Sequence, residues 1–167
     1  MEALEGVFVR ELSLEEFKRY SEKAALMHDA LALLKDVSEG VCEDDAIKET
    51  VQMLERLCGA GEERKYYGIF AGREYAGYLA FRGYETETPE IAIELEESWQ
   101  GKGIGYRFLK AETERIFKER TDVRYFRYRV ADDNLPSIKL IEKLGGCLMG
   151  IDHSTGETVM EYRIYRS

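Results

Sequence analysis

The sequence predicts an α/β protein, more closely an α+β fold, in which about four helices flank one mixed, largely antiparallel sheet of six to seven strands. Two observations point there. Short runs rich in β-branched and aromatic residues alternate along the chain with amphipathic stretches of helical spacing. In the middle of the chain, three such runs follow one another with only short turns between them, which is typical of a meander. A length of 167 residues, with 44% hydrophobic residues and two prolines, fits a single domain over residues 1–167.

The first third of the chain is expected to hold one strand and two helices. Residues 7–12 read "VFVREL", a pattern that favours a strand. Ser13 and Glu16 then match a capping box, so a helix should begin here and continue to about Lys35. After the linker "DVSEGVCED", a second helix is expected over residues 44–57.

The remaining elements follow from the same two periodicities. Strands are expected over residues 65–72, 73–83 and 90–97, a helix over 106–120, a strand over 123–130, a helix over 134–146 that Gly145 ends, and strands over 147–152 and 158–165.

Charge and residue counts argue against several classes of function. A formal net charge of −9 disfavours nucleic acid, whose phosphates need clustered Lys and Arg, and suits cationic or neutral small partners. Cys42, Cys58 and Cys147 are odd in number and lack C-x-x-C spacing, so neither a disulfide framework nor a thiolate zinc site is expected. His28 and His153 are too isolated to indicate a metal cluster, and no metal is expected. No signal peptide or membrane-spanning run is present, so a cytoplasmic location is expected.

The stretch "GKGIG" supplies the strongest local signal for a ligand. Gly101, Gly103 and Gly105 alternate between an expected strand and an expected helix, where backbone N–H groups can approach a phosphate without side chains in the way. Two better-known phosphate motifs fail: the dinucleotide pattern would need glycine at Tyr106, and the Walker pattern needs G-K-[ST]. A glycine-rich turn with no ligand is the alternative.

Two longer motifs give this loop a context. Gln100, Gly103 and Gly105 form Q-x-x-G-x-G, which resembles the acetyl-CoA pyrophosphate loop of the GNAT superfamily, the GCN5-related N-acetyltransferases. "NLPSIKLIEKLGG" resembles that superfamily's later N-x-x-S-x-x-L-x-E-K-L-G helix and matches it from Asn134 and Ser137 to Gly145. The expected element order also resembles the GNAT fold over nearly all of the chain.

The resemblance implies an N-acetyltransferase in which an amine attacks the thioester of acetyl-CoA directly, without a covalent enzyme intermediate. It also implies a bulge in the strand before the loop, a backbone N–H of Leu95 facing the thioester carbonyl, and pantetheine pairing along Leu95 and Glu97. The residues expected to bind acetyl-CoA are Leu95, Glu97, Gln100, Gly101, Lys102, Gly103, Ile104, Gly105, Tyr106, Asn134 and Ser137. Lys102 has the alternative of solvating the turn, and Asn134 and Ser137 that of stabilising the first turn of their helix.

Candidate catalytic residues come from strand alternation. Ala92, Glu94 and Glu96 share one face of the expected strand, so their carboxylates can line a cleft beside the acetyl group. Glu94, with Glu96 as second choice, is the expected base that deprotonates the incoming ammonium, directly or through water. An ordinary solvated glutamate is the alternative for each.

One departure from the family pattern bears on activity. Many GNAT enzymes carry a tyrosine seven residues after the asparagine, where it protonates the leaving thiolate, and this chain has Ile141 there. A thiol with a pKa of about 8.5 leaves without such help, so activity is still expected. The rival hypothesis is a catalytically weak GNAT-fold module that senses acyl-CoA. The acceptor, a small molecule or a protein N-terminus or lysine, is not fixed by the sequence, and a homodimer stays open.

Overall fold

The computed structural model describes residues 6–21, 64–154 and 156–167. The chain forms two compact units, one made of Met1–Arg10 with Glu63–Ser167 and the other of Glu11–Glu62. The helix expected to reach Lys35, the linker, the helix expected over residues 44–57, and Cys42, Cys58 and His28 fall wholly or partly outside the described residues.

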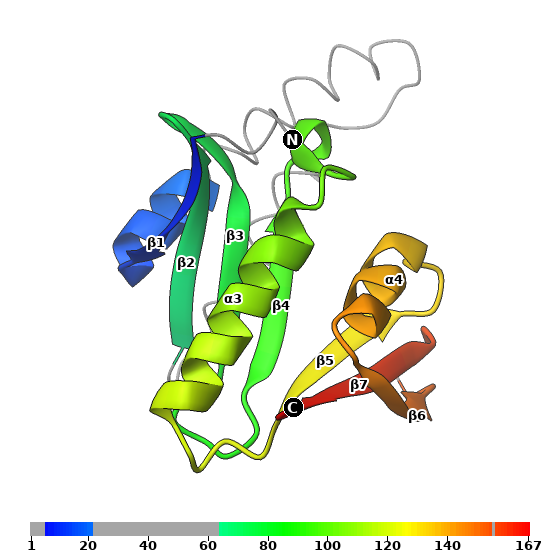
Figure 1. Cartoon of the computed structure of the whole chain (residues 1–167). Helices are drawn as coiled ribbons and strands as arrows, with labels where there is room; N and C mark the ends of the chain where they lie inside the picture. Colours follow the sequence, from blue (N-terminus) through cyan, green and yellow to red (C-terminus); the bar gives the residue numbers. More distant parts are fainter. Residues whose placement is uncertain (1–5, 22–63, 155) are drawn as a thin grey trace, which may run out of the picture. The chain divides into compact units, whose positions relative to one another are not determined.

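A seven-stranded sheet dominates the larger unit (Figure 1). Its order is β1-β2-β3-β4-β5-β7-β6. The bounds are β1 Val7–Leu12, β2 Arg64–Ala71, β3 Glu74–Arg82, β4 Glu90–Leu95, β5 Tyr125–Ala131, β6 Cys147–Asp152 and β7 Val159–Tyr165. The β2–β3, β3–β4, β5–β7 and β6–β7 pairs are antiparallel, whereas β4 and β5 are parallel. The prediction of a mixed, largely antiparallel sheet is confirmed.

The two central strands separate soon after they meet. The β4–β5 ladder consists of Glu90 with Arg127 and Ile91 with Tyr128, so β4 has no β5 partner beyond Ile91. Figure 1 shows the two strands running apart from this common end. On its other side, β4 pairs with β3 without a register shift, and the shift in this region lies in the β2–β3 ladder. The predicted bulge in the strand before the loop is therefore wrong.

In the part of the chain that the structure describes, two helices cover one face of this sheet. They are α3 (Ile104–Glu119) and α4 (Leu135–Lys143), close to the predicted bounds. α3 buries Leu109, Ile116 and Phe117, and the Phe117 ring packs edge-on against Phe126 of β5 with centroids 4.7 Å apart. The alternating apolar residues of the strands, such as Ile91, complete this core, because every second side chain of a strand faces the helices.

Local capping also follows the prediction. A helix begins at Leu14 and extends at least to Ser21, where the described part of this segment ends. The Ser13 hydroxyl accepts the Glu16 N–H at 3.1 Å, and the Glu16 carboxylate accepts the Ser13 N–H at 3.0 Å. The reciprocal pair confirms the capping box.

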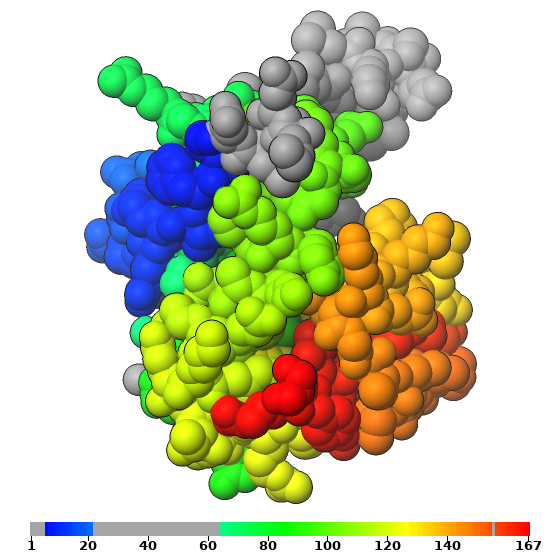
Figure 2. Space-filling view, in the orientation of Figure 1, coloured from blue at the N-terminus to red at the C-terminus, as the bar shows by residue number. Residues whose placement is uncertain are grey.

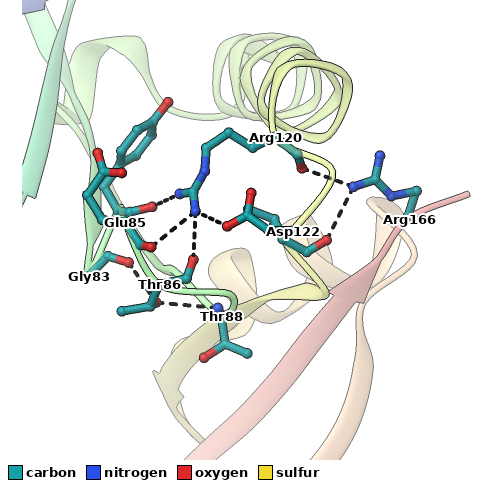
Figure 3. Close-up of polar contacts among 9 residues, drawn as sticks. Gly83, Glu85, Thr86, Thr88, Arg120, Asp122 and Arg166 are labelled. Atoms are coloured by element: carbon teal, nitrogen blue, oxygen red, sulfur yellow. Dashed lines mark hydrogen bonds and ion pairs between the residues drawn. The ribbon is translucent and has the colours of Figure 1, made fainter.

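The guanidinium of Arg120 links the end of α3 to the turn between β3 and β4 by hydrogen bonds (Figure 3). Arg120 donates to the carbonyl of Tyr84, to those of Glu85 at 3.1 Å and Thr86 at 3.3 Å, and to the carboxylate of Asp122. Arg166, at the end of the chain, donates in turn to the Arg120 carbonyl at 3.1 Å. These bonds fix the connections at the end of the sheet where β4 and β5 still pair.

Candidate active site

The glycine loop leaves the N-terminus of α3 open to a ligand. Gly101 and Gly103 have φ of 71° and 76°, the left-handed region that favours glycine. Gly103 is the N-cap, and the first helical bond is from the Arg107 N–H to the Gly103 carbonyl at 3.1 Å. The N–H groups at positions 104–106 therefore have no acceptor inside the helix. Among the described residues, no side chain caps this end and no acid lies in its first turn, so the positive end of the helix dipole stays uncompensated.

Gly105 has a different reason to be glycine. It is buried, and a Cβ at this position would lie 3.2 Å from Cδ1 of Ile93 and 3.5 Å from Cδ2 of Leu140. The absence of a side chain lets α3 approach both β4 and α4 closely.

The end of β4 presents backbone groups to the gap left by β5. The Glu96 N–H bonds the Ala76 carbonyl of β3 at 2.9 Å. Because backbone groups alternate in direction along a strand, the Leu95 N–H points the other way, toward the side where β5 has diverged. The Leu95 carbonyl on that same side accepts Nε2 of Gln100 at 2.8 Å, which ties the loop to the strand end.

Glu97 does not continue this strand. β4 ends at Leu95, and Glu97 begins a short 3-10 turn, Glu97–Trp99, whose first carbonyl accepts the Gln100 N–H at 3.2 Å. Glu97 therefore lies outside the extended strand, and its pairing with pantetheine stays a prediction. By alternation, Ile93 is the other β4 residue whose backbone faces the gap beside Leu95.

A cleft of about 490 Å³ joins these features. Figure 2 shows α3 (green to yellow-green) and α4 (orange), which supply two of its walls, side by side on one surface. Of the residues predicted from sequence, the cleft is lined by Glu94, Leu95, Gln100, Gly101, Gly103, Ile104, Gly105, Tyr106, Asn134 and Ser137. Its other lining residues are Ile93, Pro136, Lys139, Leu140 and Lys143. These five residues were not predicted from the sequence to bind acetyl-CoA, although Leu140 and Lys143 belong to the second motif.

Glu96, Glu97 and Lys102 do not line this cleft. The Lys102 ammonium lies 4.7 Å from the centre of the Trp99 ring, and the Trp99 indole donates to Glu74 at 3.2 Å. This arrangement suits the alternative in which Lys102 stabilises and solvates the turn.

Glu94 lines the cleft and has a hydrogen-bonding partner on the neighbouring strand. Tyr78 lies opposite Glu94 in the β3–β4 register, and its hydroxyl donates to Oε2 of Glu94 at 3.2 Å. Burial, followed by the negative charge of Glu94, raises the pKa of Tyr78 well above its ordinary value. The phenol is therefore protonated at neutral pH and can donate to Glu94, while the Glu94 side chain itself is exposed.

The start of α4 is built from its own residues. Asn134 is the N-cap, and its Oδ1 accepts the Ser137 N–H at 3.3 Å. Burial raises the pKa of Tyr128 on β5, and a hydrogen bond with Ser137 acts in the opposite direction. Capping, the alternative role of Asn134, is thus present, and both side chains still line the cleft.

Ile141 lies in the core rather than in the cleft. Its side chain is fully buried among the apolar residues beneath α4. The residue that replaces the family tyrosine therefore contributes packing, and this position offers no acid to a leaving thiolate.

In the described part of the chain, no helix has the length and apolar character needed to cross a bilayer. In the same residues, no group of three or more His, Cys, Asp and Glu side chains is placed to hold a metal ion.

Comparison with known proteins places these features in a family. The model of the acetyltransferase (GNAT) domain matches residues 9–146. No curated protein matches the sequence significantly. Among solved structures, the ribosomal L7/L12 α-N-protein acetyltransferase RimL in complex with coenzyme A is 22% identical, with a TM-score of 0.67 over 96% of this chain and 94% of that one.

Two more structures show the same fold. An acetyltransferase from Salmonella typhimurium that modifies the N-terminal serine of ribosomal protein L7/L12 is 20% identical, with a TM-score of 0.63 over 97% of this chain and 96% of that one. A dodecameric spermidine N-acetyltransferase from Vibrio cholerae is 13% identical, with a TM-score of 0.62 over 96% of this chain and 94% of that one. The family match spans most of the chain and agrees with the open α3 N-terminus and the separated β4 and β5 strands, and the chain accordingly belongs to the GNAT family of acetyl-CoA-dependent N-acetyltransferases.

Proposed function

We propose that acetyl-CoA lies in the cleft between β4, α3 and α4, with its pyrophosphate at the N-terminus of α3. The N–H groups at positions 104–106 carry this proposal, because they have no acceptor inside the helix and lie at a helix end that lines the cleft and that no side chain of the described residues caps. The pantetheine arm would extend along β4, where the backbone groups of Ile93 and Leu95 face the gap left by β5. Acetyl-CoA supplies the activated acetyl thioester when it is bound.

Glu94 is the base in this proposal and Tyr78 positions it. The carboxylate takes the proton that the acceptor ammonium must lose before its nitrogen can attack. The hydrogen bond from Tyr78 restricts the Glu94 side chain to one orientation at the cleft, and the high pKa of the phenol keeps that hydrogen in place over the working pH range. The Leu95 N–H, which points into the gap, would donate to the oxygen on which negative charge develops.

The proposed acceptor is a cationic amine. Glu94, Glu96 and Glu97 lie at or just beyond the end of β4. Glu90, earlier in the strand, is neutralised by Arg82 at 3.6 Å and Arg127 at 3.5 Å. Among the described residues, the acid that lines the cleft is Glu94, and no Lys or Arg of that part of the chain forms an ion pair with it. A negative field attracts an ammonium group, so polyamines, aminoglycosides, peptide N-termini and lysines all fit. A cytoplasmic location and a homodimer stay predictions.

Thiol release from acetyl-CoA, measured with a panel of cationic, neutral and anionic amines, tests this function. Cationic amines should react fastest, and their KM should rise with ionic strength because salt screens the attraction. A preference for neutral or anionic amines, or a KM indifferent to salt, would exclude electrostatic capture. CoA binding without thiol release for any amine would instead favour the sensor hypothesis.

A further inference from the structure

The α4 wall of the cleft carries two cations for which the acetyl-transfer chemistry has no use. Lys139 and Lys143 both line the cleft, and they are one helical turn apart on α4, so their stems leave the same face about 6 Å from each other along the axis. The acid among the cleft-lining residues is Glu94, which comes from β4 rather than from α3 or α4. In a chain with a net charge of −9, this wall is locally basic.

The two lysines also differ from two of the cations on the neighbouring helix. On α3, Lys110 pairs with Glu114 at 3.9 Å, and Arg115 pairs with Glu112 at 2.9 Å. Among the described residues, neither Lys139 nor Lys143 has such an acidic partner. The Lys143 ammonium lies 4.3 Å from the centre of the Tyr106 ring, which holds it beside the first turn of α3. Their charges therefore remain available to an anion in the cleft.

The pyrophosphate of a bound nucleotide already has donors on the other wall. The N–H groups at positions 104–106 and the positive end of the α3 dipole satisfy it from the loop side. CoA carries one more phosphate, a dianion on the ribose 3′-oxygen, and the two lysines line the same cleft from α4. We propose that Lys139 and Lys143 bind this 3′-phosphate and make the cleft select CoA over 3′-dephospho-CoA.

This inference rests on the proposed CoA cleft, and a ratio of two affinities tests it separately. The dissociation constants of CoA and 3′-dephospho-CoA are measured by calorimetry for the full chain, for Lys139→Gln/Lys143→Gln and for Lys118→Gln. Glutamine keeps most of the side-chain stem and removes the charge. Lys118 is a matched control, since it is exposed, lies in the last turn of α3 and does not line the cleft.

The parent should bind CoA roughly 5- to 20-fold more tightly than 3′-dephospho-CoA, the range expected for two exposed ion pairs. The double variant should lower this ratio to within about twofold while its affinity for 3′-dephospho-CoA stays unchanged, and Lys118→Gln should keep the parental ratio. Lys143→Arg, which retains the charge, should keep most of the preference. Higher salt should reduce the parental ratio toward that of the double variant.

Three results would overturn the proposal. An unchanged ratio in the double variant would show that the lysines do not contact the 3′-phosphate. Equal weakening of both nucleotides would assign the lysines to the pyrophosphate, and an equal fall in Lys118→Gln would assign the effect to net charge. If CoA does not bind in this cleft at all, the result is different: a substitution at Gly103 would then leave the dissociation constants of both nucleotides unchanged.

Discussion

Replacement of Gly103 tests the phosphate loop most directly, because its cost can be worked out from backbone geometry. The residue has φ of 76° and ψ of 4°, and a Cβ at this position would meet no atom within 4 Å. The penalty is therefore conformational rather than steric. Alanine in the left-handed region costs about 1 kcal/mol and valine about 2 kcal/mol, whereas asparagine tolerates this region and costs a few tenths.

This conformational cost can appear either as a lower free energy of unfolding or as a weaker affinity for CoA. If the loop of a Gly103 variant keeps its shape, the free energy of unfolding falls by the full amount and CoA binds as before. If the loop relaxes, stability is retained and CoA must restore the bound conformation, which weakens binding by about fivefold for alanine and about 30-fold for valine. Because a side chain at position 103 would touch no neighbour that holds it in place, we expect mainly the second outcome.

The assay combines denaturant unfolding with calorimetric titration of CoA. The two losses should sum to about 1 kcal/mol for Gly103→Ala and about 2 kcal/mol for Gly103→Val, with Gly103→Asn close to the parent. An asparagine variant as impaired as the valine variant would refute the conformational argument. Gly103→Val with unchanged stability and unchanged CoA affinity would show that the loop is not the binding site.

Three further predictions concern the base, alkaline stability and the Arg120 network. Glu94→Gln should lower turnover roughly 10- to 1000-fold with little change in CoA affinity. Tyr78→Phe should lower turnover less, and combining it with Glu94→Gln should cause no further loss. If the two losses of turnover were additive in the double variant, Tyr78 would not act through Glu94. The folded-state pKa of Tyr78 is raised above the ordinary 10.0, so its contribution to stability is complete below pH 10 and is lost as pH rises beyond it. The free energy of unfolding should therefore fall above pH 10, and it should fall more steeply in the parent than in Tyr78→Phe. Equal slopes in the two proteins would contradict this. Arg120→Ala should lower the free energy of unfolding by about 1–3 kcal/mol, because it removes charged donors from partly exposed carbonyls. Arg120→Lys should recover only part of this loss. A loss below about 0.5 kcal/mol, the size typical of ordinary surface substitutions, would show that water replaces the guanidinium.

The two loop glycines illustrate where sequence reasoning stops. The alternation of glycines predicted a strand-to-helix turn with accessible N–H groups, and Gly103 satisfies this by its φ alone. Gly105 is restricted instead by Ile93 and Leu140, which come from another strand and another helix. No local pattern contains that information, so only the packed structure distinguishes a substitution that strains the loop from one that disturbs the core.

The sequence by itself determined the features that depend on neighbouring residues. The Ser13–Glu16 capping box, the strand and helix periodicities of the described elements and the glycine loop all rest on interactions within a few positions, and the element order followed from them. Tertiary structure decided what depends on register between distant segments. It paired Tyr78 with Glu94, ended β4 before Glu97, separated β4 from β5 and placed Lys143 over Tyr106. The physical reason is that strand pairing and helix packing join residues far apart in the chain. On the strands, a one-residue slip of register would turn Tyr78 or Glu94 to the opposite face of the sheet.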